Sequence, residues 1–565
     1  MSDDTDAELL RRVQAMIEAG ELADAVILLD DALLESPDDA DRLQLRAAVD
    51  LRSGRPDEAI ERLERVLELA PRHGPAHHNL AMALHRQARS EEALRHLRLA
   101  IEELPDPVPS LMAIALIQRD LSAADAMLDT ARRLTRIAPM RAAVWNVYGD
   151  ALLFAKLPDE AVWAYQMASR LEPDSASALN ALGTAYQFAG RLRDAADAFR
   201  RSARLAPDNM NPVVNLYGVL LSSGNHEEAA RLLGSVLSHD PHHIGAIRAA
   251  GVARLAEAPD RLAWEAYEAR TQAMTVIPNM PVFQSEALVW EGADDPQTRL
   301  LVVAEQGFGD VFLFARYLRE AARRVGTLSV VAPPATLSLM RGLPWLAEVV
   351  DNRDLEAYPD HDAWVFMGSL PLRLARYAPA DVPTDEPWLV VPEVNLAHWR
   401  ERLPDGETGV RRARVGLAWQ GQARHLRNRC RSIDTAGLRP LLDAAPVDFY
   451  VLQPNQNVLP DAPDVHDLGP ELADFADTAA ALLRMDLVIT VDTALANLAG
   501  ALGVPFWVLL DVGPDWRWGK QAERTDWYPT ARLFRQTTAF DWAPVIAEVT
   551  AALTDWLRSE GYATS

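Results

Sequence analysis

The sequence has one cysteine, two lysines and no long apolar run. Cys430 is the only cysteine in 565 residues, which excludes a disulfide framework and a zinc site built from cysteines. No stretch approaches the roughly 18 consecutive apolar residues that a membrane-spanning helix needs, so we expect no membrane span. Lys156 and Lys520 are the only lysines, so a bound phosphate would be held mostly by arginine or by backbone N–H groups.

Positive charge is also scarce. The chain has 56 basic and 81 acidic residues and a net charge of −25, which disfavours nucleic-acid binding, because that function needs a phosphate-neutralising surface. A protein partner or a small substrate fits this charge better. The first ten residues are acidic and lack both a basic stretch and an apolar core, so we expect no signal peptide and a cytoplasmic protein.

A repeat of 34 residues runs through the first half of the chain. Seven prolines mark it: Pro37, Pro71, Pro105, Pro139, Pro173, Pro207 and Pro241. An alanine stands 12 residues before each proline except Pro139, and apolar residues lie between them at helical spacing. The pattern resembles the tetratricopeptide repeat over residues 6–241, about seven helical hairpins, followed by a degenerate helical pair. We therefore predict an α-solenoid over residues 1–275.

Asparagines recur on the first helix of several predicted repeats. They precede the usually small helix position by two or three residues and are Asn79, Asn146, Asn180 and Asn215. Their amides suit hydrogen bonds to an extended peptide in an acceptor groove. Solvent-facing asparagines without a role are an equally good interpretation.

The second half has the pattern of two consecutive parallel α/β units. Short β-rich runs alternate with amphipathic segments, including a predicted helix over residues 311–324. The predicted strands are 299–304, 328–332, 347–350, 364–367, 415–419, 449–453, 487–491 and 505–510. We predict two Rossmann-like lobes, 276–410 and 411–565, with a cleft between them. A C-terminal helix over 541–557 is expected to cross back to the first lobe.

The first candidate site is the segment EQGFGD at residues 305–310, between a strand and a helix. Gly307 and Gly309 permit a tight turn, but the third glycine of a dinucleotide fingerprint is missing, which argues against NAD. Asp310 either caps the helix or points into the cleft as a general base for an acceptor hydroxyl.

Two further segments carry candidate chemistry. Asp492 and Thr493 follow a predicted strand and begin a helix, whose free N–H groups suit a phosphate. Gln420 directly follows another predicted strand, before an arginine cluster that either clamps an anion or forms a solvated basic loop. The cluster contains Arg424, Arg427, Arg429 and Arg431. No carboxylate or histidine cluster in the lobes has metal-ligand spacing, so we expect no metal.

Six segments together carry a family resemblance over about residues 280–550. They are AEQGFGD, VGLAWQG with RNRCRS, DLGPELADFADTAAALL, VDTALANLAGALG, PDWRWG and WYPTARLFRQ. They resemble the C-terminal half of bacterial tetratricopeptide-repeat glycosyltransferases, which is similar to the heptosyltransferase-like GT-B fold. The resemblance implies an acceptor-side N-terminal lobe, a donor-side C-terminal lobe and no metal.

The resemblance also implies roles for individual residues. Asp310 matches a general base, and Asp492 and Thr493 match the donor phosphate site. The family usually has histidine where this chain has Asn497, which can hydrogen-bond a donor but carries no proton or charge at pH 7. Arg429 or Arg431 is expected to stabilise the departing phosphate. Gln420, Gly307 and Gly309 complete the expected donor-binding set.

A transferase domain joined to repeats resembles both protein O-GlcNAc transferases and the flagellin glycosyltransferases of alphaproteobacteria. The second resemblance implies transfer of a nonulosonic acid of the pseudaminic or legionaminic type, from its CMP-linked form, to Ser or Thr of flagellin captured by the repeats. A UDP-sugar or another NDP-sugar donor stays open. The alternatives are a scaffold with an inactive transferase domain, an O-GlcNAc-type transferase and a transferase for envelope saccharides.

Overall fold

The fold is described from a computed structural model. It describes residues 2–274, 287–382, 386–404, 412–422, 425–443, 446–454, 464–520 and 523–562. The predicted domain boundaries at 275/276 and 410/411, and Arg424 of the arginine cluster, lie outside these residues.

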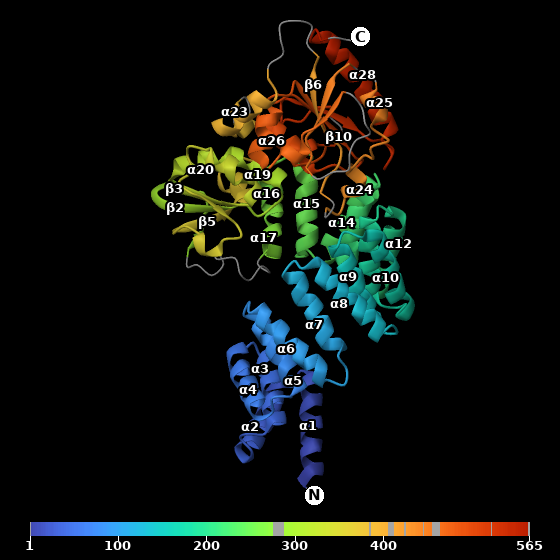
Figure 1. Ribbon diagram of the computed structural model, residues 1–565, viewed down its shortest axis with the longest axis vertical. Helices are drawn as coiled ribbons and strands as arrows, with labels where there is room; N and C mark the ends of the chain where they lie inside the picture. The colour runs from blue at the N-terminus through green and yellow to red at the C-terminus, as the bar shows by residue number, and fades with distance from the viewer. Residues whose placement is uncertain are drawn as a thin grey trace. The chain divides into compact units, whose positions relative to one another are not determined.

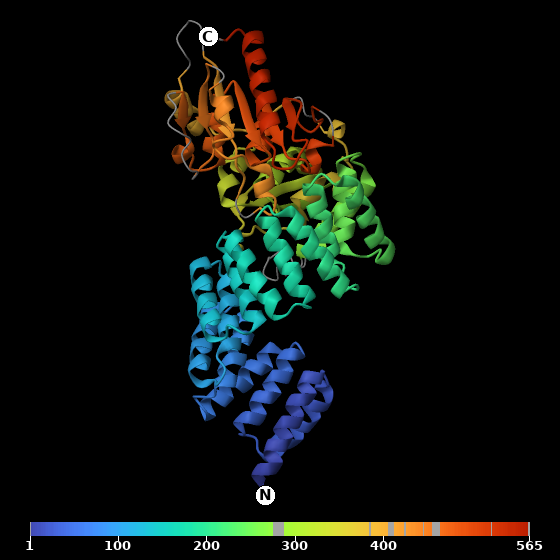
Figure 2. The same ribbon diagram turned by 90° about the vertical axis from the view of Figure 1, so that its right-hand side faces the viewer.

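The first half consists of helices that pair as antiparallel hairpins within each part of the chain (Figure 2). The helices are α1 Ser2–Ala19, α2 Leu22–Glu35, α3 Ala40–Arg52, α4 Pro56–Leu69, α5 Gly74–Arg86, α6 Ser90–Glu103, α7 Val108–Asp120, α8 Ala124–Ile137, α9 Ala142–Phe154, α10 Pro158–Leu171, α11 Ala176–Phe188, α12 Leu192–Leu205, α13 Asn211–Ser222, α14 His226–His239, α15 Ile244–Leu255, α16 Arg261–Tyr267 and α17 Ala269–Met274.

The repeat pattern explains this array. Each of the seven prolines lies between the second helix of one hairpin and the first helix of the next, where its missing N–H breaks no helical hydrogen bond. The small residues bring the two helices of a hairpin together. A Cβ at Gly149, for example, would lie 2.6 Å from the ring of Tyr165. The predicted solenoid is therefore confirmed.

The chain divides into two compact units, Met1–Ala189 and Gly190–Ser565. Helices α12 to α17 thus belong to the same unit as the α/β lobes. Trp264 of α16 is 1% exposed and packs edge-on against Trp516, Trp527 and Phe314 of the lobes. The last helices of the array are therefore part of the core that supports the lobes.

The N-terminal lobe contains a parallel sheet with the order β1-β5-β2-β3-β4. Its strands are β1 Leu288–Val289, β2 Asp295–Val303, β3 Val325–Ala332, β4 Val349–Asp351 and β5 Ala363–Phe366. Its helices include α19 Phe308–Phe314, α20 Leu318–Arg324, α21 Leu337–Arg341 and α22 Leu370–Arg373. Helix α23 Glu393–Arg402 follows in the chain and packs against α26 Phe475–Leu482 of the C-terminal lobe. The helix predicted over 311–324 is wrong as a single element. It begins earlier and is divided by the 3-10 turn η1, Ala315–Tyr317.

The C-terminal lobe contains a second parallel sheet with the order β11-β10-β9-β6-β7-β8. Its strands are β6 Arg414–Ala418, β7 Asp448–Val451, β8 Val465–Asp467, β9 Leu487–Val491, β10 Phe506–Leu510 and β11 Ala531–Arg535. Its helices are α24 Asn428–Arg431, α25 Arg439–Leu442, α26 Phe475–Leu482, α27 Ala494–Ala501 and α28 Ala543–Ser559, with the 3-10 turn η7 at Trp516–Trp518.

The C-terminal helix α28 packs on its own lobe (Figure 1). Its residues Val545, Val549 and Leu553 are buried in one cluster with Val415 and Phe449 of the second sheet. The expected crossing of this helix to the N-terminal lobe is therefore wrong, because its apolar face is already covered by the C-terminal sheet.

The strand orders place the site. In the second sheet the chain runs outward from β6 to β7 and β8, then returns with β9 on the other side of β6. In the first sheet it runs from β2 to β3 and β4, then returns with β5 beside β2. Ligands of open parallel sheets bind in the crevice beyond the carboxyl ends of the strands at such a reversal. The segments after β2, β6 and β9 are those singled out in the sequence.

Candidate active site

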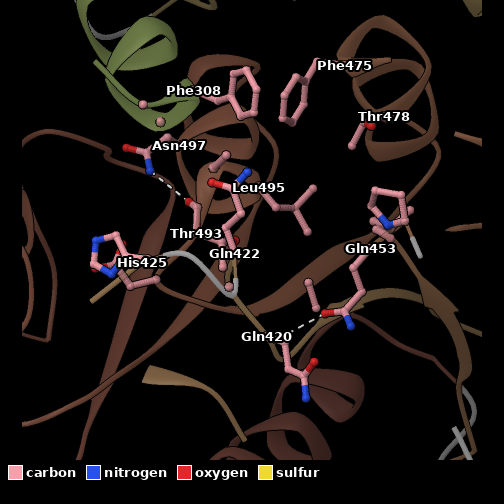
Figure 3. Close-up of a pocket in the computed structure, with 18 of the residues that line it drawn as sticks. Phe308, Gln420, Gln422, His425, Gln453, Phe475, Thr478, Thr493, Leu495 and Asn497 are labelled. Carbon is pink, nitrogen blue, oxygen red and sulfur yellow. Dashed lines mark hydrogen bonds between the residues drawn. The ribbon is translucent and has the colours of Figure 1, made fainter. Parts of the chain in front are cut away.

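A cleft of about 610 Å³ lies at these strand ends. Residues 307–310 line it from the N-terminal lobe, and residues after β6, β7, β9 and β10 line it from the C-terminal lobe. Phe308 and Phe475, with ring centroids 4.9 Å apart, lie together at the edge away from Gln420 (Figure 3). Of the nine predicted catalytic and donor-binding residues, the cleft collects Asp310, Asp492, Thr493, Asn497, Arg431, Gln420, Gly307 and Gly309.

Asp310 belongs to the first turn of α19 but does not cap it. Gly307 is the N-cap residue, and Asp310 Oδ1 instead accepts a hydrogen bond from Arg517 Nη2. The capping interpretation is thus replaced by an ion pair at the cleft wall. Gly309 is required by packing, since a Cβ there would lie 2.8 Å from Asn497 Nδ2.

A buried ionic network supports the turn that carries Asp310. Arg270 of α17 donates from Nε and Nη2 to Glu305 Oε1 at 3.1 and 3.0 Å, and from Nη1 to Glu268 Oε1 at 2.6 Å. Tyr267 donates to Gln306 Oε1 at 2.9 Å. Burial raises the pKa of Glu305, and the guanidinium of Arg270 acts against that shift. The network ties the last helix of the array to residues 305 and 306.

The start of α27 forms the second wall. Thr493 is the N-cap residue, as predicted, but within the described contacts its hydroxyl accepts no hydrogen bond from the first turn. The first backbone N–H groups of α27 are therefore left without a side-chain cap, beside the cleft-lining Ala494 and Leu495. A helix N-terminus in this state favours an anion.

Arg431 lies beside this helix start, whereas Arg429 does not line the cleft. Arg431 Nη1 donates to the carbonyl oxygen of Asp492 at 2.9 Å, and Arg431 Nε has no hydrogen-bond partner among the described residues. Burial lowers the pKa of Arg431. The Arg429 side chain lies near Gly190. The two residues are two positions apart on the short helix α24, so their side chains point in different directions.

Asn497 is 3% exposed, and its amide is committed to the protein. Its Nδ2 donates to the Thr493 carbonyl at 2.9 Å (Figure 3), and its Oδ1 accepts from Arg517 Nη1 at 2.9 Å and from Tyr528 at 2.7 Å. In this structure Asn497 therefore holds Arg517 and the start of α27.

Gln420 lies at the other end of the cleft (Figure 3). Its backbone N–H donates to Gln453 Oε1 at 3.2 Å, and the N–H of Trp419 donates to the same oxygen at 2.8 Å. Gln453 is 7% exposed, so this side chain fixes the path of the chain after β6. Gln453 was not predicted as a site residue, because it ends the predicted strand 449–453 and belongs to none of the candidate segments.

Arg517 and Asp515 are the main residues missed from the sequence. Arg517 is 5% exposed and donates to Asp310, Asn497 and Asp515, which come from three different segments. Burial opposes the charge on Arg517, but Asp515 and Asp310 raise its pKa. Burial, and then the neighbouring Asp515, raise the pKa of Asp492. The signal that could have found Arg517 is its place within PDWRWG, a segment that carries the family resemblance.

The four asparagines of the predicted acceptor groove lie on the first helices of their hairpins. Asn79 is on α5, Asn146 on α9, Asn180 on α11 and Asn215 on α13, and all four are half-buried. The first three belong to the first compact unit and Asn215 to the second. Their position agrees with either interpretation, so a role in peptide binding stays a prediction.

The described residues contain no group of three or more His, Cys, Asp or Glu side chains placed to hold a metal ion. None of their helices has both the length and the apolar character needed to cross a membrane.

Comparison with known proteins identifies the repeats. Tetratricopeptide-repeat family models match residues 50–114 and 176–209. The chain is 29% identical over 322 residues to Protein FlbA of Caulobacter vibrioides (strain ATCC 19089 / CIP 103742 / CB 15), and the match covers 52% of each protein. The chain thus spans about half the length of this curated relative.

Solved structures match parts of the chain. YrrB, described as a TPR protein with an unusual peptide-binding site, is 16% identical over 33% of this chain and 95% of its own, with a TM-score of 0.28. The Cut9–Hcn1 complex of APC/C gives 17% identity over 41% of this chain and 46% of that one, with a TM-score of 0.35. The first half of the chain is a tetratricopeptide-repeat solenoid, and the region after it is α/β with parallel sheets.

Proposed function

We propose that the chain is a glycosyltransferase that moves a sugar from a nucleotide-activated donor to a Ser or Thr hydroxyl of a protein held by the repeats. One observation carries the proposal. A single cleft is lined by Asp310 of one lobe and by Arg431 and the uncapped start of α27 of the other. A carboxylate facing an anion site is the arrangement that glycosyl transfer to a hydroxyl requires.

The donor phosphate binds at the start of α27. Its uncapped N–H groups and the partial positive charge of the helix terminus favour an anion there. Arg431 supplies the formal positive charge, with Nε unpartnered among the described residues. Arg427 also lines the cleft but is paired with Asp511, so Arg431 is the guanidinium left for the phosphate of a CMP-linked donor. A UDP-sugar or another NDP-sugar is the alternative.

The reaction needs one proton acceptor and one stabilised leaving group. The acceptor hydroxyl oxygen attacks the anomeric carbon and forms the new C–O bond, while its proton passes to the carboxylate of Asp310. The bond between the anomeric carbon and the phosphate oxygen breaks, and the phosphate leaves with the electron pair. The start of α27 and Arg431 stabilise the negative charge that develops on it.

The acceptor is a protein, because the first half of the chain is a repeat solenoid of a class that binds proteins and peptides. Asn79, Asn146, Asn180 and Asn215 are the candidates for contacts to its backbone. Flagellin as the acceptor and a nonulosonic acid as the sugar rest on the resemblance of the sequence to flagellin glycosyltransferases.

The intact mass of flagellin tests the proposal. Cells of the source bacterium that carry the wild-type gene, no gene or the Asp310→Asn form are compared by mass spectrometry of purified flagellin. A mass that falls by multiples of one sugar in both altered strains supports flagellin glycosylation with Asp310 as the base. An unchanged mass in the deletion strain refutes flagellin as the acceptor, and a normal mass with Asp310→Asn refutes the base.

A second candidate is a scaffold whose transferase lobes are inactive. Two observations favour it: Asp310 is engaged by Arg517, and the amide of Asn497 is committed inside the protein. Calorimetry of the full chain with CMP and with UDP separates the two candidates. Binding of either nucleotide, lost with Arg431→Ala, supports the transferase, and absence of binding supports the scaffold.

A transferase for envelope saccharides predicts that the first repeats are dispensable. The second compact unit begins at Gly190, so the informative deletion removes residues 1–189 and leaves α12 to α17 in place. Full transfer to the native acceptor by this fragment favours the saccharide enzyme. Loss of transfer to a protein acceptor, with nucleotide binding retained, favours the protein transferase.

A further inference from the structure

Arg517 links the two lobes through one guanidinium group. Its Nη2 donates to Asp310 Oδ1 of the N-terminal lobe, its Nη1 donates to Asn497 Oδ1 of α27 at 2.9 Å, and its Nε donates to Asp515 Oδ1 at 2.8 Å. The planar fork of arginine makes such contacts in fixed directions, which the ammonium of lysine cannot reproduce.

The hydrogen bond from Arg517 engages only one of the two carboxylate oxygens of Asp310. Oδ1 is occupied by Arg517, whereas Oδ2 faces the side of Gly307, 3.6 Å from the position that a Cβ would take there. Both Gly307 and Asp310 line the cleft. The carboxylate is thus held by one oxygen and presents the other beside a residue without a side chain.

Arg517 belongs to the segment 511–520. Some side chains of this segment line the cleft, and others contact the last repeats. Asp511, Asp515 and Arg517 line the cleft. Val512, Gly513 and Trp516 contact the last repeats instead. A Cβ at Gly513 would lie 2.5 Å from the Leu221 carbonyl oxygen.

Three further contacts join this segment to the repeats. Val512 lies against the turn at Gly224, 3.8 Å from the position of a Cβ there. The Trp516 ring packs edge-on against Trp264 with centroids 5.6 Å apart, and Lys520 pairs with Glu257. Residue 224 lies in the turn between α13 and α14, and residue 257 in the turn between α15 and α16, each within one hairpin. The repeats therefore support the segment that presents Arg517 to the cleft.

We propose that Arg517 is a positioning residue for the transfer reaction. It holds Asp310 by Oδ1 so that Oδ2 accepts the proton of the acceptor hydroxyl, and the turns of the last repeats set its place. The inference rests on the proposed function. The repeats from α13 onward accordingly contribute to catalytic geometry in addition to any contact with the acceptor protein.

The first test compares Arg517→Lys with Asp310→Asn and with the double variant in the full chain. The assay measures transfer from a CMP-activated sugar to flagellin, and calorimetry measures CMP affinity. Arg517→Lys is expected to lower kcat about 10- to 100-fold, because small misplacements of a catalytic group have effects of that size. The donor KM and the CMP affinity are expected to change by less than about threefold, because the donor phosphate contacts are kept.

The double variant distinguishes a positioning role of Arg517 from a purely structural one. Without the carboxylate there is nothing for Arg517 to orient, so Arg517→Lys should cause no further loss of kcat in the Asp310→Asn background. Losses of kcat that multiply in the double variant would overturn the proposal. A rise in donor KM with unchanged kcat in Arg517→Lys would overturn it as well.

A remote pair of variants tests the support from the repeats without altering the cleft. Gly513→Ala places a methyl group against the Leu221 carbonyl, whereas Gly234→Ala on α14 meets nothing within 4 Å. Gly513→Ala is expected to lower kcat at unchanged CMP affinity, and Gly234→Ala to match the wild type. Equal kcat for the two variants would overturn the role of the repeats.

Failure of the inference is distinguishable from failure of the proposed function. A wild-type chain that transfers no sugar and binds neither CMP nor UDP refutes the function and, with it, the role of Arg517. A wild-type chain that transfers sugar, combined with multiplying losses in the double variant, refutes only the inference.

Discussion

The structure makes opposite predictions for two arginines that the sequence treats alike. Arg429 and Arg431 both lie on α24, and one or the other was expected to stabilise the departing phosphate. Only Arg431 lines the cleft beside the start of α27, where it already contacts the Asp492 carbonyl. Hydrogen bonds to charged groups contribute about 1.5–3 kcal/mol. At about 1.4 kcal/mol per tenfold, Arg431→Ala should weaken nucleotide binding about 10- to 150-fold.

Calorimetry of the full chain with CMP and UDP measures this difference. Arg429→Ala is the matched control, since it removes the same charge from the same helix while leaving the cleft wall intact. Its Kd should stay within about twofold of the wild type, because long-range effects of one surface charge are small at physiological salt. An equal loss of affinity in both variants, or a larger loss with Arg429→Ala, would refute the geometry assigned to α24.

Three further predictions concern stability. A fragment of residues 190–565 should fold, whereas one of residues 276–565 should not, because the latter lacks Trp264 and its helix; circular dichroism and thermal unfolding distinguish them. Trp264→Ala should cost about 3–5 kcal/mol in urea unfolding of the longer fragment, and a cost below about 1 kcal/mol would show that α16 is peripheral. Asp492→Asn should raise the Tm at pH 7, because burial beside Asp515 raises the folded-state pKa of Asp492 above its unfolded value. That gain should disappear as the pH falls through the folded pKa towards about 3.9, and a gain that persists at pH 3 would contradict the assignment.

Strand positions and strand-end motifs were predictable because local patterns encode them. Strand β9 has the predicted bounds, and β2, β3 and β6 agree with prediction within a few residues. Buried parallel strands are continuous apolar runs, which the sequence displays directly. The segments that carry Asp310 and Thr493 were found for the same reason, since each connects such a run to a helix.

Other elements have no local pattern that identifies them. Strand β1 is two exposed residues, Leu288–Val289, and β8 is the polar triplet Val465–Asp467. Each is a strand because of the neighbour with which it pairs, β5 and β7 respectively. The division of the predicted helix 311–324 by η1 likewise reflects its surroundings, where Tyr317 is completely buried.

Arg517 acts on residues that lie too far away in the sequence to belong to one motif. Its partner Asp310 is 207 residues away, and Asn497 is 20 residues away. In the sequence, PDWRWG is one of the segments that carry the family resemblance, and the segment itself does not show which of its side chains enters the cleft. The fold turns Arg517 into the cleft and Trp516 towards Trp264. The difference between Arg429 and Arg431 has the same origin, because the orientation of a four-residue helix is set by its tertiary contacts.

The buried core that the two sheets share limits how far the lobes can move apart. Leu300 and Val330 of the first sheet lie in one apolar cluster with Val488 and Val508 of the second. A hinge motion that separated the lobes would expose this cluster to water, at a cost of about 25 cal/mol for each Å² uncovered. For the proposed transferase, donor entry and nucleotide release would then use an opening that is present without nucleotide. The scattering radius of the 190–565 fragment should accordingly be nearly the same with and without nucleotide.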